Sequence, residues 1–249
     1  MGLLQDKVAI ITGASSGIGR AAALLFSAEG AAVVLNARGE SALEVVAARI
    51  RDQGGKARAV AGDASQPETH RRLVSEAVGA FGGLDIAFNN AGATGPIAPL
   101  ADIAFADWQT TIAANLHSAF LASVHQIPAM LERKGGAIIF TSSFVGTSVG
   151  LPGMAAYAAA KAGLMGLVKG IAADYGDKGI RANALLPGGV DTPMAGDSAQ
   201  KEWAAGLHAM KRIARPEEIA SAALFLASSM ASFVTGSALF ADGGNAAVK

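Results

Sequence analysis

The chain contains no cysteine, so disulfide bridges, thiolate nucleophiles and thiolate metal ligands are all excluded. It has no surplus of charge either, because 20 basic and 20 acidic residues balance along its 249 residues. Without a basic stripe or a Lys/Arg-rich amphipathic segment, we expect neither nucleic acid nor a membrane as a partner. No apolar run approaches the roughly 18 residues that a bilayer span requires.

The first residues lack the basic segment and the long apolar core of a secretory signal. Asp6 also stands where a myristoylation motif requires Ser or Thr. We therefore expect a cytoplasmic protein, with which the absence of cysteine is compatible. No carboxylate or cysteine cluster accompanies the scattered histidines, so no metal site is predicted; they are His70, His117, His125 and His208.

Apolar residues make up 51% of the chain, enough for the core of one large domain over residues 1–249. Short apolar runs alternate with segments of helical spacing, which predicts an α/β fold with a doubly wound parallel sheet and helices on both faces. The expected strands are Val8–Thr12, Ala32–Asn36, Ala57–Ala61, Ile86–Asn89, Ala137–Ser142, Arg181–Leu185 and Ser237–Phe240. The expected helices include Ala21–Glu29, Leu43–Gln53, Pro67–Phe81, Ala155–Tyr175 and Pro216–Ser228.

The least regular stretch, Pro187–Met210, follows an expected strand and is interrupted by Pro, Gly, Asp and Ser. Ligands of open α/β sheets bind beyond the carboxyl ends of the strands, so residues 187–210 are a candidate substrate lid. Together with Gly146–Met154, this stretch is expected to determine the substrate. Several apolar side chains of the two stretches could line a pocket or could simply be packing; they are Leu151, Met154, Met194 and Trp203.

A glycine-rich turn, Thr12–Arg20, joins the first expected strand to the first expected helix. Its spacing is G-x-x-x-G-x-G rather than G-x-G-x-x-G, and glycines can also simply terminate strands. At this position, however, such a turn lets backbone N–H groups approach a pyrophosphate at a helix N-terminus. We therefore interpret it as a dinucleotide-binding loop.

The end of the second strand, Asn36-Ala37-Arg38, bears on the choice of dinucleotide. NAD sites usually place a carboxylate here for the ribose 2′-hydroxyl, and this chain has none before Glu40. Arg38 can pair with a 2′-phosphate, which favours NADP(H). NAD(H) remains the alternative, in which Arg38 is a solvated loop residue.

Several motifs in this order resemble the classical short-chain dehydrogenase/reductase family over essentially the full chain. They are Thr12–Gly19, Asn89–Gly92, Asn115, Ser142–Ser143, Tyr157-x-x-x-Lys161, Pro187-Gly188 with Thr192, and Asp242–Gly244. The resemblance implies a Rossmann-type sheet of seven strands, a small-molecule carbonyl or alcohol substrate and a homotetramer. Its coenzyme contacts correspond to Gly13, Ser15, Ser16, Gly17, Ile18, Gly19, Arg38, Asp63, Ala64, Asn89, Ala91, Gly92, Tyr157, Lys161, Pro187, Gly188, Val190 and Thr192.

Tyr157 and Lys161 are four residues apart in a segment of helical spacing, so their side chains share one face. Alone, such a pair is usually ordinary helix decoration, but this segment is otherwise Ala, Gly, Leu and Met. A nearby ammonium group lowers the pKa of a phenol from about 10. The pair is thus expected to act as general acid in reduction and as general base in oxidation.

The resemblance assigns two further catalytic residues. Ser143 would hold the substrate oxygen, although it lies one step further from Tyr157 than is common in the family, so Ser142 remains an alternative. Asn115 would anchor a water that carries protons to Lys161, or would only bond a local carbonyl.

The segment Ala155–Ala173 is apolar or small on nearly every face, which favours burial within the homotetramer that the resemblance implies. The substrate stays open among a 3-oxoacyl thioester, a sugar or polyol, a steroid-like ring ketone and a small aromatic ketone. A non-catalytic redox sensor should have lost the Tyr/Lys/Ser set, which is intact. Epimerases and dehydratases of related fold generally carry a longer C-terminal substrate region. We therefore expect an NADP(H)-dependent oxidoreductase.

Overall fold

The computed structural model describes residues 2–248 and contains one parallel sheet of seven strands, in the order β3-β2-β1-β4-β5-β6-β7. Every neighbouring pair of strands runs parallel. The strands are β1 (Val8–Thr12), β2 (Ala32–Ala37), β3 (Ala57–Ala61), β4 (Ile86–Asn89), β5 (Gly136–Thr141), β6 (Ile180–Pro187) and β7 (Ala238–Ala241). The predicted α/β fold, a Rossmann-type doubly wound sheet, is confirmed.

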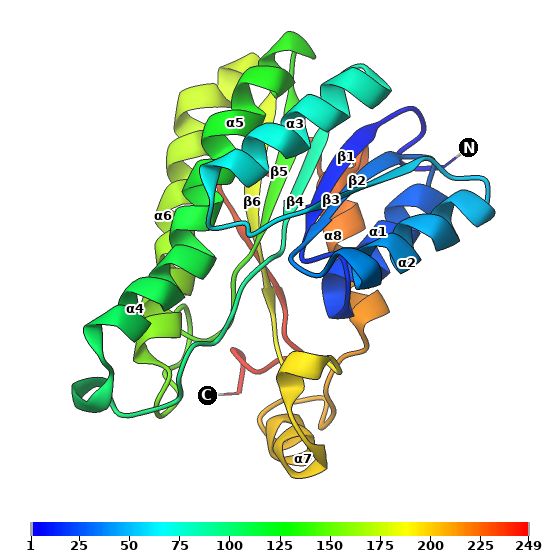
Figure 1. The fold of residues 1–249 in the computed structure, drawn as a ribbon. Helices are drawn as coiled ribbons and strands as arrows, with labels where there is room; N and C mark the ends of the chain where they lie inside the picture. Colours follow the sequence, from blue (N-terminus) through cyan, green and yellow to red (C-terminus); the bar gives the residue numbers. More distant parts are fainter. Residues whose placement is uncertain (1, 249) are drawn as a thin grey trace.

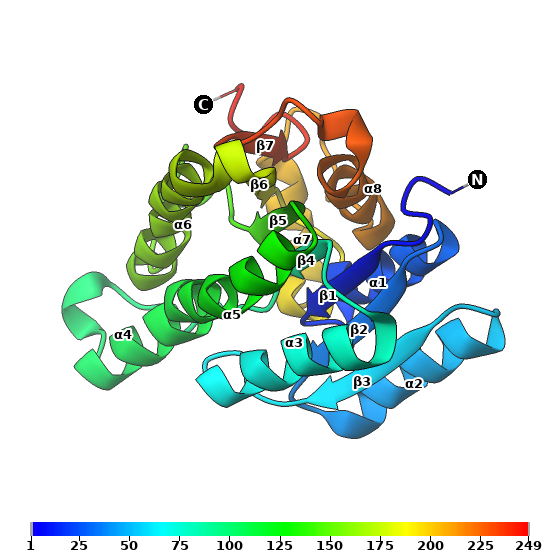
Figure 2. The same ribbon diagram turned by 90° about the horizontal axis from the view of Figure 1, so that it is seen from above.

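Helices cover both faces of the sheet, as the view from above shows (Figure 2). One layer consists of α1 (Gly17–Ala28), α2 (Glu40–Asp52) and α8 (Pro216–Ala227), and the other of α3 (Pro67–Phe81), α5 (Ser118–Glu132) and α6 (Ala155–Tyr175). Successive residues of β1 point into opposite layers: Ile11 packs in the first and Ile10 in the second. Continuous apolar strands are therefore expected in the centre of the sheet, where both faces are covered, whereas the edge strands β3 and β7 keep exposed residues.

Three helices lie outside the expected ranges: α5 and two shorter helices. A short helix α4 (Phe105–Ile112) runs through a π turn (Ala113–His117) into α5, and α7 (Ser198–Gly206) lies inside the stretch expected to be irregular. The helix α7 begins at a capping box, in which the Asp197 side chain accepts from the N–H of Gln200 and the Gln200 side chain accepts from the N–H of Asp197.

The strand order reverses between β1 and β4, so the loops that follow these two strands diverge at the carboxyl edge of the sheet. In open α/β sheets this reversal creates the crevice where ligands bind. The helix α7 and the C-terminal segment lie at the same edge (Figure 1). The fold thus concentrates its site at the ends of β1, β4, β5 and β6.

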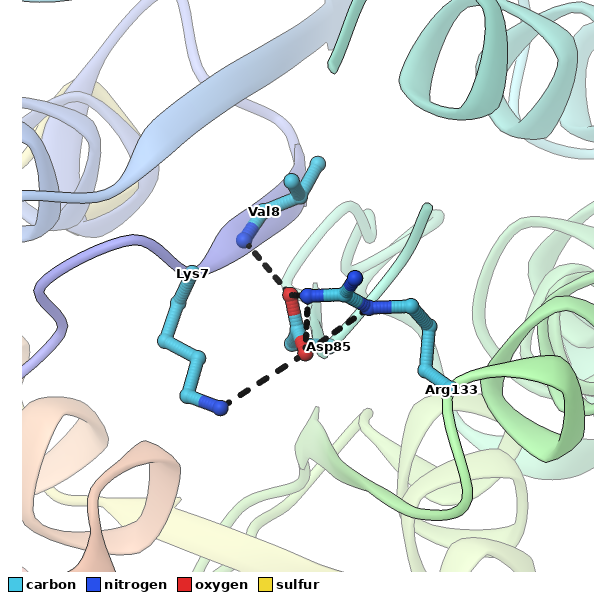
Figure 3. A network of polar contacts seen from close by, with 4 residues as sticks. All are labelled: Lys7, Val8, Asp85 and Arg133. Carbon is cyan, nitrogen blue, oxygen red and sulfur yellow. Dashed lines mark hydrogen bonds and ion pairs between the residues drawn. The ribbon is translucent and has the colours of Figure 1, made fainter. Parts of the chain in front are cut away.

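A buried carboxylate connects two strands at the amino edge of the sheet, opposite the carboxyl edge. Asp85 directly precedes β4, is buried, and accepts a 2.9 Å hydrogen bond from the N–H of Val8 at the start of β1. The guanidinium of Arg133, just after α5, lies 3.3 Å away and the ammonium of Lys7 lies 3.6 Å away (Figure 3). This network joins two adjacent strands and a helix far from the carboxyl edge.

None of the helices within residues 2–248 has the length and hydropathy needed to cross a membrane.

Candidate active site

The glycine turn after β1 is shaped by close backbone contacts. Gly13 and Gly17 adopt φ values of +68° and +51°, which side-chain-bearing residues rarely adopt. A Cβ atom on Gly19 would collide with the carbonyl oxygen of Gly13. The first turn of α1 holds no acidic residue, and its N-cap, Ser16, makes no side-chain capping bond. The N–H groups at this helix end therefore remain available to an anion, and the turn fits a pyrophosphate.

Threonine and asparagine side chains tie the end of β1 to β4 and β5. The Thr12 hydroxyl oxygen accepts 3.0 Å hydrogen bonds from the N–H groups of Asn90 and Ala91. The Asn90 amide donates to the carbonyl of Thr12, and its oxygen accepts from the Thr141 hydroxyl at 3.1 Å. These bonds place the Asn90–Ala91 backbone against the glycine turn.

The side chain of Asn89 points toward α5 and not toward the glycine turn. Its side-chain amide exchanges two 2.9 Å hydrogen bonds with Gln126 of α5 and is buried. The side chain is thus committed to packing, and Asn90 is the amide that approaches Gly13. The asparagine doublet in the sequence indicated this cleft, but only the fold separates the two roles.

Arg38 and Asp63 follow the neighbouring strands β2 and β3, and both are exposed at the carboxyl edge. Asp63 accepts a 2.8 Å hydrogen bond from the N–H of Ser65. Below them, the Asn36 amide donates to the carbonyls of Val60 and Gly62 at 3.0 Å and joins the two strand ends. Ala64 is buried, and its carbonyl lies 2.7 Å from the ring of His70.

Lys161 lies on α6 with only 3% of its surface exposed. Its ammonium donates a 2.7 Å hydrogen bond to the carbonyl of Thr141 and stands 5.5 Å from the ring centre of Tyr157. Burial lowers the pKa of Lys161 to about 8, because the charged form loses hydration.

The expected lowering of the Tyr157 pKa by Lys161 is not found. Burial raises the pKa of Tyr157, and hydrogen bonding with the Ser143 side chain partly opposes that rise. Desolvation shifts the pKa of each group toward its neutral form, but Lys161, with a pKa of about 8, still carries its proton at neutral pH. The phenol is accordingly protonated at neutral pH.

The two serines after β5 have different partners. The Ser142 hydroxyl donates a 2.9 Å hydrogen bond to the carbonyl of Lys161 and is buried. The Ser143 hydroxyl oxygen accepts from the N–H of Val145 at 3.1 Å, which leaves its proton free toward Tyr157. The geometry therefore favours Ser143 over Ser142 for contact with a bound oxygen.

Asn115 lies in the π turn between α4 and α5, a local widening that often occurs at functional sites. Its amide donates 2.8 Å hydrogen bonds to the carbonyls of Ala93 and Thr111, and its oxygen accepts from the N–H of Ala93. A Cβ atom on Gly92 would lie 2.6 Å from this oxygen and 3.2 Å from the Lys161 nitrogen. Asn115, Gly92 and Lys161 thus converge.

The residues after β6 face the glycine turn. A Cβ atom on Gly17 would lie 2.9 Å from the Thr192 methyl carbon. Gly188 donates its N–H to the carbonyl of Ala241 at 3.2 Å, and Val190 forms a bridge with Ala214. Thr192 therefore lies against the start of α1, and Gly188 and Val190 are held by the segments at Ala241 and Ala214.

The family model described as enoyl-(acyl carrier protein) reductase matches residues 13–246. A cyclohexanol dehydrogenase of Acinetobacter sp. (strain SE19) is 40% identical over 96% of this chain and 94% of its own length. The chain belongs to the short-chain dehydrogenase/reductase family. A 2,5-dichloro-2,5-cyclohexadiene-1,4-diol dehydrogenase of Sphingobium indicum is 42% identical over 98% of this chain and 99% of its own.

Solved structures agree with this assignment. A short-chain type dehydrogenase/reductase from Mycobacterium marinum superposes with a TM-score of 0.92 at 35% identity, over 97% of this chain and 96% of that one. Levodione reductase superposes with a TM-score of 0.93 at 31% identity, over 99% and 100%. This short-chain dehydrogenase/reductase is therefore an NAD(P)-dependent oxidoreductase acting on CH–OH or C=O groups.

Three residues hold the short-chain dehydrogenase/reductase site together without having been given a role of their own: Thr12 and Asn90, which lie within the motifs Thr12–Gly19 and Asn89–Gly92, and Thr141, which lies outside every quoted motif. All three lie at strand ends next to predicted residues, so their position was the available signal. Among residues 2–248, the His, Asp and Glu side chains form no group of three that could hold a metal ion.

Proposed function

We propose that this protein transfers a hydride between NADP(H) and the carbinol or carbonyl carbon of a small cyclic substrate, with Tyr157 as general acid and base. The observation that carries the proposal is the meeting of Tyr157, Ser143 and Lys161 beside the glycine turn at the carboxyl edge of the sheet.

The chain offers a complete cradle for the dinucleotide. The turn Gly13–Gly19 would hold the pyrophosphate, Asp63 and Ala64 the adenine side, and residues 187–192 the nicotinamide side. Arg38 is exposed beyond β2, and among the described residues it makes no ion pair. An uncommitted guanidinium at this position supports a 2′-phosphate and hence NADP(H). When bound, the coenzyme supplies or accepts the hydride.

The protein's own groups manage the proton. In reduction, the protonated phenol of Tyr157 donates its proton to the substrate oxygen as negative charge develops there. The Ser143 hydroxyl proton, which points toward Tyr157, would hydrogen-bond to the same oxygen and stabilise that charge. Lys161, when protonated, stabilises the phenolate that Tyr157 leaves behind. In oxidation the same groups act in reverse, with the Tyr157 phenolate as base.

Relatives of the chain support a ring-bearing substrate. Besides cyclohexanol and the chlorinated cyclohexadiene diol, their names include cis-4-hydroxycyclohexanecarboxylate and a 3β-hydroxysteroid, each with a hydroxyl on a ring. We therefore favour an alicyclic secondary alcohol or the corresponding ketone. Apolar Met194 and Trp203 of the proposed lid (residues 187–210) are exposed toward solvent, which is compatible with walls that close over a ring.

A paired substrate and coenzyme panel tests the proposal. Cyclohexanol, cyclohexanone, linear secondary alcohols and 3-oxoacyl thioesters are assayed with NADP(H) and NAD(H) in parallel. We expect turnover of the cyclic pair with NADP(H) and, for Arg38→Ala, a KM for NADPH raised about tenfold with little change for NADH. An equal effect on both coenzymes, or a wild-type preference for NADH, would refute the role of Arg38.

We further propose a homotetramer. Four aromatic side chains are exposed: Phe105 of α4 and Phe120 of α5, and, at the β7 edge of the sheet, Phe233 and Phe240. Large exposed apolar side chains on two separated surfaces support two interfaces of self-association. Light scattering should give about four times the chain mass of 24.9 kDa, and a monomer at micromolar concentration would contradict the assignment.

A further inference from the structure

A buried histidine closes the base of the proposed lid. His208 follows α7, is only 2% exposed, and its Nε2 atom accepts a 2.9 Å hydrogen bond from the N–H of Gly189. The imidazole therefore joins the last residues of the proposed lid to its first residues, immediately after β6.

The ring lies where three segments around the crevice meet. Its edge faces Phe144, the residue after Ser143, at 6.3 Å between ring centres and an interplanar angle of 63°. A Cβ atom on Gly188 would collide with Nε2, and one on Gly243 would touch the ring. His208 is thus in contact with the serine loop, the residues that follow β6 and the C-terminal loop.

The bonding of the ring distinguishes this histidine from an ordinary packing residue. Because Nε2 accepts a hydrogen bond, the neutral ring carries its proton on Nδ1, and Nδ1 has no partner among the described residues. A buried nitrogen without a partner is unfavourable, and an apolar side chain would fill the same space without that penalty. Within residues 2–248, the bond to Gly189 is the one contact that requires an imidazole here.

We propose that His208 is a positioning residue for the coenzyme, which holds the Gly188–Gly189 backbone in the conformation that receives the nicotinamide half. The inference rests on the proposed function, in which residues 187–192 line that half of the dinucleotide. No contact between His208 and the coenzyme is needed, because the imidazole acts through the main chain of Gly189.

Other bonds keep the lid base attached when the imidazole is lost. Ala214 donates its N–H to the carbonyl of Gly189 at 2.8 Å, and Asp191 donates to the carbonyl of Ala214 at 2.8 Å. Removing the imidazole should therefore free the Gly188–Gly189 peptide to reorient without releasing the whole segment. If the peptide then holds the binding conformation about a tenth of the time, the apparent affinity for the coenzyme falls about tenfold.

The test compares His208→Leu, which has no acceptor, with His208→Gln, whose amide oxygen can reach the position of Nε2. NADPH binding is measured by fluorescence titration, and thermal unfolding shows that each variant is folded. We expect the dissociation constant to rise about tenfold in the Leu variant and to stay within about threefold of wild type in the Gln variant. The kcat at saturating NADPH should change less than the dissociation constant in both.

Equal dissociation constants for the Leu and Gln variants would overturn the proposal, and so would a fall in kcat with unchanged NADPH affinity. Wild-type protein that binds no NADPH would instead overturn the proposed function. Should His208→Leu fail to fold, His208→Asn replaces it, because its amide is one carbon too short to reach Gly189. The expected order of affinity is then wild type, Gln, Asn.

Discussion

The ammonium group of Lys161 donates a 2.7 Å hydrogen bond to the main-chain carbonyl of Thr141 from a position that is 97% shielded from solvent, since only 3% of the residue is exposed. Burial lowers the pKa of this lysine to about 8 from the ordinary 10.5. The site therefore carries a charge that destabilises the folded state at neutral pH.

Replacing the lysine should stabilise the protein while abolishing its activity. The shift from 10.5 to about 8 corresponds to roughly 3 kcal/mol, and loss of the Thr141 hydrogen bond offsets about 1 kcal/mol of it. We expect Lys161→Met to be about 2 kcal/mol more stable than wild type at pH 7, measured by urea denaturation.

The pH dependence provides the control for this prediction. The folded state binds the lysine proton less tightly than the unfolded state, so the penalty is complete below pH 8 and is relieved as the pH rises from 8 to 10.5. The stability difference between variant and wild type should shrink across that window. A variant that is less stable at pH 7, or a gap independent of pH, would contradict the buried charge.

The raised pKa of Tyr157 predicts opposite pH profiles for the two directions of reaction. Reduction requires the protonated phenol and should decline as the pH rises through its pKa, whereas oxidation requires the phenolate and should increase. Profiles of kcat/KM measured in both directions test this sign. Tyr157→Phe should lower kcat by about 10²- to 10⁴-fold while NADPH still binds. Undiminished turnover in that variant would refute the proposed chemistry.

The serine doublet should separate into a catalytic and a structural member. Ser143→Ala removes a donor to the substrate oxygen and should lower kcat by about 10²-fold with little change in stability. Ser142→Ala removes the buried bond to the Lys161 carbonyl and should cost about 1 kcal/mol of stability with a smaller loss of kcat. Steady-state kinetics and denaturation of both variants decide the matter. The reverse pattern would make Ser142 the substrate contact.

Asp85 should matter for stability and not for turnover, because it lies at the edge of the sheet opposite the site. Asp85→Ala leaves the N–H of Val8 and the Arg133 guanidinium without their shared acceptor, and should cost about 2 kcal/mol. Asp85→Asn is the matched control, since its amide oxygen can still accept from Val8 and should recover part of the loss. A change in the KM for NADPH at 25 °C in either folded variant would argue against a purely structural role.

Most of the sheet could be predicted because its strands are buried on both faces and read as continuous apolar runs. Pro67 at the first position predicted where α3 begins. In the structure the helix ends before Gly82, which adopts the left-handed conformation. The helix α5 lay outside the expected ranges, and it contains Pro128, a residue that ordinarily breaks a helix. The capping signal at Asp197 was present in the sequence, but α7 has only nine residues.

The motifs also indicated a candidate site, although the energetics of that site depend on tertiary contacts. The pairing of Asn89 with Gln126 joins residues 37 positions apart, which no local pattern reveals. The predicted direction of the Tyr157 pKa shift was wrong, because the spacing of two residues along a helix does not show how much water surrounds their side chains. Sequence therefore indicated the candidate participants, whereas their protonation depends on burial.

The π turn at Ala113–His117 sets the rotational phase of the helix that follows it. A π turn contains about one residue more than an α turn, and one residue corresponds to about 100° of rotation. Deleting a single alanine there would restore a regular helix but swing the remaining part of α5, with Gln126, away from the sheet relative to α4. A chimera in which this helix is replaced by that of a relative must therefore keep the additional residue of the π turn, however similar the two sequences are.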